Sequence, residues 1–276
     1  MNHSQPEKSP LGKKSLYANE YDKSLLYSIP RKINRDNIHV PEQLPFQGVD
    51  IWNAFELSWL NPKGKPMIAI AEIVIPCSSP NIVESKSLKL YLNSFNQTKF
   101  SSMEEVRERI QKDLSEGFEA EVTVNIASPQ EFHLQQISDF EGTCLDELDI
   151  EIDHYQIDTS TFCVDETTSV EETVYSHLLK ANCLVTGQPD WLSLSIKYSG
   201  AKIDHEGLLK YIVSFRNCNE FTEQCIERVF MDISKHCSPE KLSIYGRCTR
   251  RGGLDINAFR SNFESHPDKN VRLARQ

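Results

Sequence analysis

The chain has 276 residues, of which 39% are hydrophobic and 25% charged, and its formal net charge at pH 7 is -10. Such a composition is typical of a globular protein with one large domain or two modest ones. The acidic balance argues against nucleic-acid binding, because phosphate contacts need clustered lysine and arginine. No apolar run approaches the roughly 20 residues of a membrane span. The polar N-terminus does not resemble a signal peptide, so we expect a cytoplasmic protein with no membrane contact.

Eight cysteines are scattered along the sequence without a C-x-x-C pair. Zinc-knuckle and thioredoxin-like sites therefore lack support. In a reducing compartment we expect free thiols, most of them small core residues, with one or two that carry chemistry. The sequence also lacks a glycine-rich dinucleotide fingerprint, a P-loop and an H-E-x-x-H motif, so neither a Rossmann site nor a metal site is expected.

Charged residues and prolines dominate residues 1–44 and break up any periodicity, which predicts an irregular N-terminal arm. Order is expected to begin near residue 45. Apolar, strand-like stretches follow at 51–60 and 67–75. The turn-forming segment Asn61-Pro62-Lys63-Gly64 separates these stretches, so they predict a hairpin.

From Glu84 onward the apolar residues change to helical spacing, which predicts a first helix. A second helix is expected from Ser102, because Glu105 three residues later would complete a capping box. Gly117 is expected to end this helix. An apolar stretch at 122–126 then predicts the next strand.

The second half of the chain repeats this order of two strands, two helices and further strands. The expected elements are a strand at 174–185, a turn at 186–190, a strand at 191–198, helices near 208–215 and 220–236, and closing strands between 242 and 259.

The two halves also share residues. Tyr91-Leu92-Asn93-Ser94-Phe95 matches Tyr211-Ile212-Val213-Ser214-Phe215 at the tyrosine, serine and phenylalanine, 120 positions apart. Together with the repeated order of elements, this match indicates a duplication. We therefore expect an α+β protein with domains at 45–165 and 166–276, each an antiparallel sheet with a pair of helices on one face.

The segment Glu84-Ser85-Lys86 opens the first predicted helix with a carboxylate, a hydroxyl and an amine. A helix N-terminus presents unpaired backbone N–H groups, which suit phosphate. The Glu84 carboxylate could accept paired hydrogen bonds from a guanine-like N–H edge. The alternative is a first turn in which these residues only cap the helix, and patterning alone favours that interpretation.

Cys183 and Asp190 flank the turn of the second half. A thiolate is a nucleophile, and a carboxylic acid can protonate the group that the thiolate attacks. A buried strand cysteine beside an ordinary turn aspartate is the alternative, and spacing alone favours it.

Arg250-Arg251-Gly252-Gly253 is a basic cluster in an otherwise acidic chain. Paired arginines beside glycines allow close backbone approach and bidentate phosphate contacts. A basic hairpin that discourages association of sheet edges is the alternative.

Taken together, these three segments resemble the NADPH-dependent 7-cyano-7-deazaguanine reductases of queuosine biosynthesis in their longer, two-domain form. The resemblance runs from about Tyr21 to Gln276. The segments that carry it include Leu44-Pro45-Phe46, Glu56 to Leu60, Glu84 to Thr98, His177 to Lys180, Cys183, Gln188 to Trp191, and Thr249 to Asn257.

The resemblance implies tandem tunnelling-fold domains, NADPH as cofactor, a small-molecule nitrile as substrate and a homodimer. It implies that Cys183 adds to the nitrile carbon as a covalent thioimide and that Asp190 protonates the nitrile nitrogen. Two hydrides from two NADPH molecules would then give the primary amine. The implied substrate-binding residues are Val83, Glu84, Ser85, Thr222 and Glu223, and the implied cofactor-binding residues are Ser85, Lys86, Arg251 and Gly252.

One position departs from the family pattern. The family usually has histidine in Asn-Glu-Phe-His-Glu, and this chain reads Asn219-Glu220-Phe221-Thr222-Glu223. Thr222 cannot act as an imidazole acid or base, although its hydroxyl can donate and accept hydrogen bonds. We expect the reaction class to survive and the rate to be lower.

Other functions also fit the sequence. A non-catalytic deazapurine-binding homologue impaired at Thr222 is one, and a purine or pterin cyclohydrolase-like enzyme of the same fold is another. The cyclohydrolases commonly require metal ligands, which the sequence does not display. A cysteine hydrolase is weaker still, because no histidine is visibly placed to activate Cys183.

Overall fold

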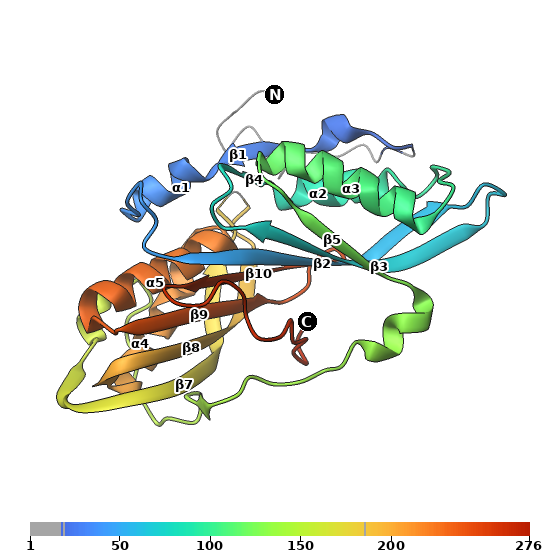
Figure 1. Cartoon of the computed structure of the whole chain (residues 1–276). Coiled ribbons are helices and arrows are strands. Elements are labelled where there is room, and N and C mark those ends of the chain that lie inside the picture. The colour runs from blue at the N-terminus through green and yellow to red at the C-terminus, as the bar shows by residue number, and fades with distance from the viewer. Residues whose placement is uncertain (1–17, 19, 185) are drawn as a thin grey trace. The chain divides into compact units, whose positions relative to one another are not determined.

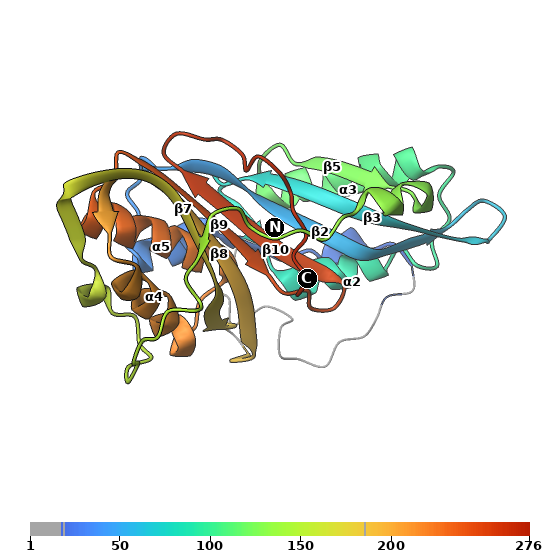
Figure 2. The same cartoon turned by 90° about the horizontal axis from the view of Figure 1, so that it is seen from below.

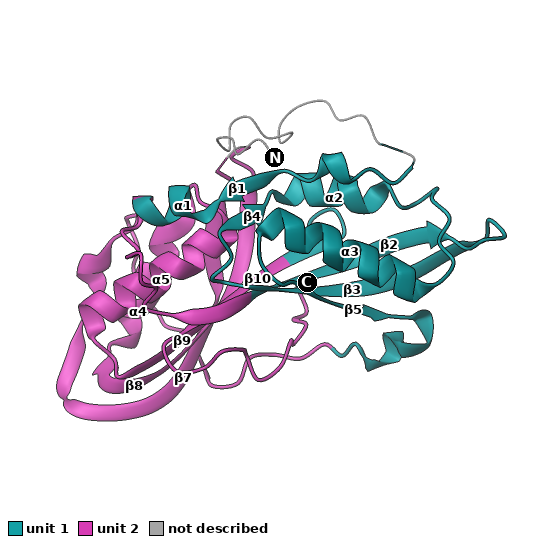
Figure 3. Cartoon of the chain, turned by 45° about the horizontal axis from the view of Figure 1, so that its top comes forward, with its two compact units in different colours: residues 1–36, 50–136, 250–255 teal, residues 37–49, 137–249, 256–276 magenta. Residues whose placement is uncertain are grey.

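The computed structural model describes residues 18, 20–184 and 186–276 of this α+β protein. Contacts between Cα atoms divide the chain into two compact units (Figure 3). Unit 1 comprises residues 1–36, 50–136 and 250–255, and unit 2 comprises residues 37–49, 137–249 and 256–276. Among the described residues, no helix is long and apolar enough to cross a membrane.

Unit 1 contains a sheet in which β3 lies between β5 and β2, with two helices on one face (Figure 1). The pairing of β3 with β5 is antiparallel. A separate antiparallel ribbon joins β1 to β4. The elements are η2 (Lys23–Leu25), β1 (Ser28–Pro30), α1 (Arg31–Asn37), β2 (Gln47–Leu60), β3 (Pro66–Pro76), β4 (Asn81–Val83), α2 (Ser85–Asn93), α3 (Met103–Phe118), β5 (Thr123–Ala127) and η3 (Pro129–Leu134).

Unit 2 contains strands in the order β10-β9-β8-β7-β6, antiparallel except for the short parallel pairing of β6 with β7. Figure 2 shows α4 and α5 against one face of these strands. The elements are β6 (Thr143–Cys144), η4 (Thr159–Thr161), β7 (Val164–Asn182), β8 (Pro189–Ile203), α4 (His205–Ser214), η5 (Phe215–Asn217), α5 (Thr222–Cys237), β9 (Lys241–Cys248) and β10 (Leu254–Ser261).

The first predicted hairpin and the four predicted helices are confirmed, while the expectation of an irregular N-terminal arm is wrong for its described part. Residues 28–30 form β1, which pairs with β4, and residues 31–37 form α1. Residues 1–17 and 19 lie outside the described residues. These short elements were not predicted because they show no apolar periodicity. Strand β1 is ordered by its pairing with the distant β4.

The two ends of α3 each differ from the prediction. Ser102 caps the helix by accepting from the Glu105 N–H, but the Glu105 carboxylate accepts from Ser101, so the reciprocal half of the capping box is absent. Gly117 does not end the helix, which continues to Phe118. Its role is close packing, since a Cβ there would lie 3.2 Å from Val83 Cγ2.

The inferred duplication is visible in equivalent hydrogen bonds within each unit. The Tyr91 hydroxyl donates to Asp113 Oδ2, and the Tyr211 hydroxyl donates to Asp232 Oδ2, each over 2.7 Å. Ser94 Oγ accepts from the Asp22 N–H in unit 1, and Ser214 Oγ accepts from the Asp158 N–H in unit 2. Asp22 and Asp158 then cap the equivalent 3-10 turns η2 and η4.

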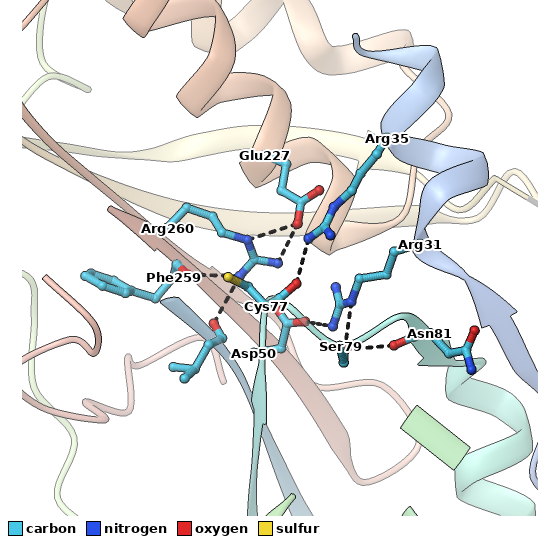
Figure 4. A network of polar contacts seen from close by, with 10 residues as sticks. Arg31, Arg35, Asp50, Cys77, Ser79, Asn81, Glu227, Phe259 and Arg260 are labelled. Atoms are coloured by element: carbon cyan, nitrogen blue, oxygen red, sulfur yellow. Dashed lines mark hydrogen bonds and ion pairs between the residues drawn. The ribbon is translucent and has the colours of Figure 1, made fainter. Parts of the chain in front are cut away.

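Both units also contain buried arginine–carboxylate pairs (Figure 4). In unit 1, Arg31 donates to Asp50 Oδ2 and to Ser79 Oγ. In unit 2, Arg260 Nε and one terminal nitrogen donate to Glu227 Oε1 at 3.0 and 2.9 Å, and both side chains are almost fully buried. The Arg260–Glu227 pair therefore holds α5 against β10, because both charged groups are buried and have no access to solvent.

We predict that Arg260→Met destabilises the protein by about 3–5 kcal/mol, because it leaves the Glu227 carboxylate buried without its guanidinium. Urea-induced unfolding measures the loss. Arg107→Met is the control, since the Arg107–Glu104 pair is largely exposed and exposed ion pairs contribute little to stability. Equal losses in the two variants would contradict the prediction.

Candidate active site

Cys183 is the first residue of the turn that joins β7 to β8. Its N–H donates to the Gln188 carbonyl over 2.8 Å, and its carbonyl accepts from the Gly187 N–H over 2.9 Å. The predicted strand extended to Val185, which lies outside the described residues, whereas β7 ends at Asn182. The turn therefore places Cys183 at a defined point at the end of the hairpin.

Asp190 lies in β8, where it pairs with Ala181, so the expectation of a turn aspartate is wrong. Its side chain therefore has the fixed direction of a strand residue. Residues Ala181 and Cys183 share one face of β7, and Asp190 opposes Ala181 on that same face. Asp190 and Cys183 are thus diagonal neighbours, which are typically about 7–8 Å apart between Cα atoms and closer between side chains.

The face that carries Cys183 and Asp190 is the one that α5 covers. Asp190 acts electrostatically on the Cys225 thiol of α5, and burial together with nearby negative charge raises the pKa of that thiol well above its ordinary value. Cys183 itself is 5% exposed. The nucleophile candidate is therefore a buried residue.

The chain segment before α5 crosses the end of this hairpin. The Asn182 N–H donates to the Cys218 carbonyl over 2.7 Å, and the Glu220 N–H donates to the Asn182 carbonyl over 3.1 Å. Thr222 and Glu223 follow as the first two residues of α5, and both are buried. Unit 2 therefore brings four of the expected residues to one end of its sheet.

Glu84 is the N-cap of α2. Its two carboxylate oxygens accept from the Lys86 and Ser87 N–H groups over 2.8 and 2.9 Å. Burial raises the pKa of this carboxyl, although the two backbone hydrogen bonds and the charges of Lys89 and Lys86 oppose the shift. The expectation of open N–H groups at this helix end is therefore wrong for Lys86 and Ser87.

Val83 and Ser85 flank Glu84 in different settings. Val83 is fully buried in β4 and pairs with Ser28, whereas Ser85 is the half-buried first residue of α2. Only Ser85 and Lys86, which is also half-buried, can therefore present their side chains to solvent from this turn.

Arg251 and Gly252 form a tight turn before β10, closed by the Arg251 N–H to the Leu254 carbonyl over 3.0 Å. Gly252 has a φ of +60°, which favours glycine. A Cβ at Gly252 would meet the Lys89 side chain at 3.3 Å, and one at Gly253 would overlap the Glu56 carboxyl. The turn therefore lies against α2 and β2, beside the basic residues of α2.

Unit 1 thus gathers a second group of expected residues around the start of α2. Lys86 and Lys89 are three positions apart, so they share one side of the helix, and the turn with Arg251 and Gly252 lies against Lys89. A cationic surface with a side-chain-free backbone segment suits a phosphate-bearing ligand. The cations would provide the contacts, because Glu84 already occupies two of the helix N–H groups.

Sequence reasoning missed the ion pair between Glu220 and Arg228. It placed Glu220 at the start of a helix, whereas α5 begins at Thr222 and Glu220 is a buried residue of the crossing segment. Comparison of the two halves could have revealed it, because the equivalent position in the first half is Phe100.

Two family models match the chain. The model described as nitrile reductase, 7-cyano-7-deazaguanine-reductase N-term matches residues 17–126, and that of QueF-like protein matches residues 189–267. The second match begins just after Cys183 and includes Asp190, Thr222 and Glu223.

Curated relatives match almost the whole chain, and each is named NADPH-dependent 7-cyano-7-deazaguanine reductase. The protein of Cupriavidus necator is 56% identical over 98% of this chain and 99% of its own length. That of Ralstonia nicotianae is 56% identical over 99% and 100%, and that of Chromobacterium violaceum is 54% identical over 98% of each. Identity of this extent confirms the resemblance read from the motifs, and the chain belongs to the family of NADPH-dependent 7-cyano-7-deazaguanine reductases.

Proposed function

We propose that this chain uses NADPH to reduce the nitrile of 7-cyano-7-deazaguanine to the primary amine of 7-aminomethyl-7-deazaguanine, a step of tRNA queuosine biosynthesis. The relatives carry this activity in their names. The observation that supports it most directly is the placement of Cys183 and Asp190 on one face at the end of the β7–β8 hairpin.

Three of the other cysteines are poorly suited to be the nucleophile. Burial and neighbouring Glu220 raise the pKa of Cys218 to about 12, and burial raises that of Cys237 to about 11. The pKa of Cys225 is also raised well above its ordinary value. Because the thiolate is the reactive form, these three thiols are poor nucleophiles at neutral pH.

The proposed first step is addition of the Cys183 sulfur to the nitrile carbon. A carbon–sulfur bond forms, one π bond of the nitrile breaks, and its electron pair takes a proton from Asp190 at nitrogen, which gives a thioimide. Asp190 must therefore carry a proton while Cys183 is a thiolate. NADPH, when bound, would supply the two hydrides. Between the two transfers the carbon–sulfur bond breaks, which returns the electron pair to the Cys183 sulfur and leaves a C=N group for the second reduction.

Substrate recognition would use carboxylates for the N–H edge of the base. In unit 2, Glu223 is buried in the first turn of α5. In unit 1, each oxygen of Glu84 has a lone pair beyond the one that caps α2. The proposed substrate-binding set also includes Val83, which would make apolar contact. It further includes Ser85 and Thr222, whose hydroxyl groups would form hydrogen bonds.

The proposed cofactor residues are Ser85, Lys86, Arg251 and Gly252. Two cations, a hydroxyl and an open glycine turn fit the phosphates and ribose hydroxyls of a dinucleotide without a Rossmann fingerprint.

We further propose that the two units are tandem tunnelling-fold domains, and we propose a cytoplasmic location and a homodimer. The duplicated hydrogen bonds of the two units support the tandem arrangement. A net charge of -10 supports action on a small molecule and not on the polynucleotide itself.

The variant Cys183→Ala should lose nitrile-dependent NADPH oxidation and the covalent adduct seen by intact mass spectrometry. The expected loss of turnover is at least about 1,000-fold, because no other group can form the thioimide. Cys237→Ala is the matched control and should retain activity. If wild type binds the nitrile base but shows neither adduct nor NADPH oxidation, the chain is a binding module.

Thiol alkylation by iodoacetamide at pH 8 should leave Cys218, Cys225 and Cys237 unmodified, while the exposed Cys163 reacts. The thiolate fraction of a group with a pKa about three or more units above the solution pH is about 0.001 or less. Peptide mass spectrometry measures the pattern, and alkylation in urea should modify all eight. Labelling of Cys218 as fast as Cys163 would contradict the raised pKa.

Restoring the family histidine by Thr222→His should raise kcat/KM for the nitrile by about 100-fold, at the lower end of what a positioned acid or base contributes. The gain should depend on pH near 6.5, where imidazole titrates. Steady-state kinetics measure both effects. Unchanged turnover and substrate affinity would mean that Thr222 limits neither positioning nor proton delivery.

A further inference from the structure

The two halves of the chain provide an internal comparison at the crossing segment before each second long helix. In unit 1, the Leu60 N–H donates to the Thr98 carbonyl and the Phe100 N–H donates to the Leu60 carbonyl, each over 2.9 Å. In unit 2, Asn182 makes the same two bonds with Cys218 and Glu220. Phe100 and Glu220 therefore occupy equivalent positions, 120 residues apart.

These two equivalent positions are both buried, but one carries an apolar side chain and the other a charged one. Phe100 is 5% exposed and stacks on Phe95 with ring centroids 5.2 Å apart. Glu220 is 6% exposed, and its carboxylate accepts from Arg228 Nε over 2.9 Å and from Gln224 Nε2 over 3.4 Å. A buried ion pair rarely stabilises a fold more than an apolar cluster of similar size does. Because an apolar residue packs well at this position in unit 1, stability does not explain why unit 2 has an ion pair there.

The location of Glu220 indicates what the Glu220–Arg228 ion pair could do. Its N–H bonds to Asn182, the residue immediately before Cys183, and its carboxylate bonds to Arg228, which lies almost two turns into α5. Lys180 strengthens the same junction by donating to Asn182 Oδ1 and to the Arg216 carbonyl. The ion pair thus joins the hairpin that carries the nucleophile to the helix that carries Thr222 and Glu223.

We propose that Glu220 and Arg228 are positioning residues that set the place of Cys183 relative to Glu223, and thereby align the nitrile carbon with the sulfur. This inference rests on the proposed function. Neither residue touches the substrate. The pair acts through the backbone of the crossing segment, so its loss should slow sulfur addition and leave cofactor binding unchanged, because the proposed cofactor residues belong to unit 1.

The test uses the full chain with two variants, Glu220→Gln and the double variant Glu220→Gln, Arg228→Met. The single variant leaves the guanidinium without its carboxylate, and the double variant replaces the ion pair with groups of similar size that carry no charge. Glu104→Gln is the matched control, because Glu104 lies in the first turn of α3 and makes an exposed ion pair. Three quantities are measured: the rate of adduct formation with the nitrile base, KM for NADPH, and the midpoint of thermal unfolding.

Both test variants should form the adduct about 10- to 100-fold more slowly, since small misplacements of reacting groups have effects of that size. KM for NADPH should change less than about twofold. A general loss of folded protein would lower the amplitude of adduct formation and leave its rate constant unchanged. The double variant should unfold at or above the wild-type midpoint, because neutral packing replaces a buried pair. The Glu104→Gln control should match wild type in all three.

Three results would overturn the inference. The first is wild-type adduct formation in both test variants. The second is recovery of the rate in the double variant, which would show that an unpaired charge and not the lost pair caused the defect. The third is a loss that scales with the folded fraction. If wild type itself forms no adduct, the proposed function fails and this inference with it, so the two failures are distinguishable.

Discussion

The backbone bonds between Asn182 and the segment 218–220 are the constraint on which the site in unit 2 depends. Strand β7 ends at Asn182, so the next residue, Cys183, has no ladder partner beyond the turn itself. The crossing segment fixes the hairpin end by accepting from Asn182 on one side and donating to it on the other. The start of α5 is fixed by the same bonds. The proposed nucleophile thereby lies next to a residue that is held on both sides, and covalent catalysis requires such rigidity of a group that must meet one carbon atom.

The sequence predicted the elements that are long and periodic, and it missed those whose order comes from distant pairing. Helices α2 to α5 follow from apolar spacing and caps, and the hairpin of β2 and β3 follows from a turn signal between two apolar runs. The three-residue strand β1 could not be found this way, because Ser28-Ile29-Pro30 is stabilised by β4, about 50 positions later. Gly117 shows a related limit, since a helix glycine can serve close packing as well as termination.

At the candidate site, the family motifs pointed to functional roles for several residues. Spacing alone would have assigned the same residues to helix caps and turns. Patterning favoured Glu84 as a helix cap, and the structure confirms that it is one. Patterning also favoured Asp190 as a turn residue, and that was wrong, because β8 begins at Pro189 and takes Asp190 into the ladder. The difference matters chemically. A turn aspartate can point anywhere, whereas the strand register directs this carboxyl to the face that bears the thiol.

The two halves carry different side chains at equivalent positions of the same scaffold. Glu84 and Asp204 cap equivalent helices in the two halves, but Lys86 and Lys89 of α2 correspond to Glu206 and the buried Leu209 of α4. The basic surface is therefore specific to the first half. Conversely, Asn61 and Phe100 of the first half correspond to Cys183 and Glu220 of the second. Each half thus keeps the shared backbone hydrogen bonds, while the side chains at these equivalent positions differ in charge and chemistry.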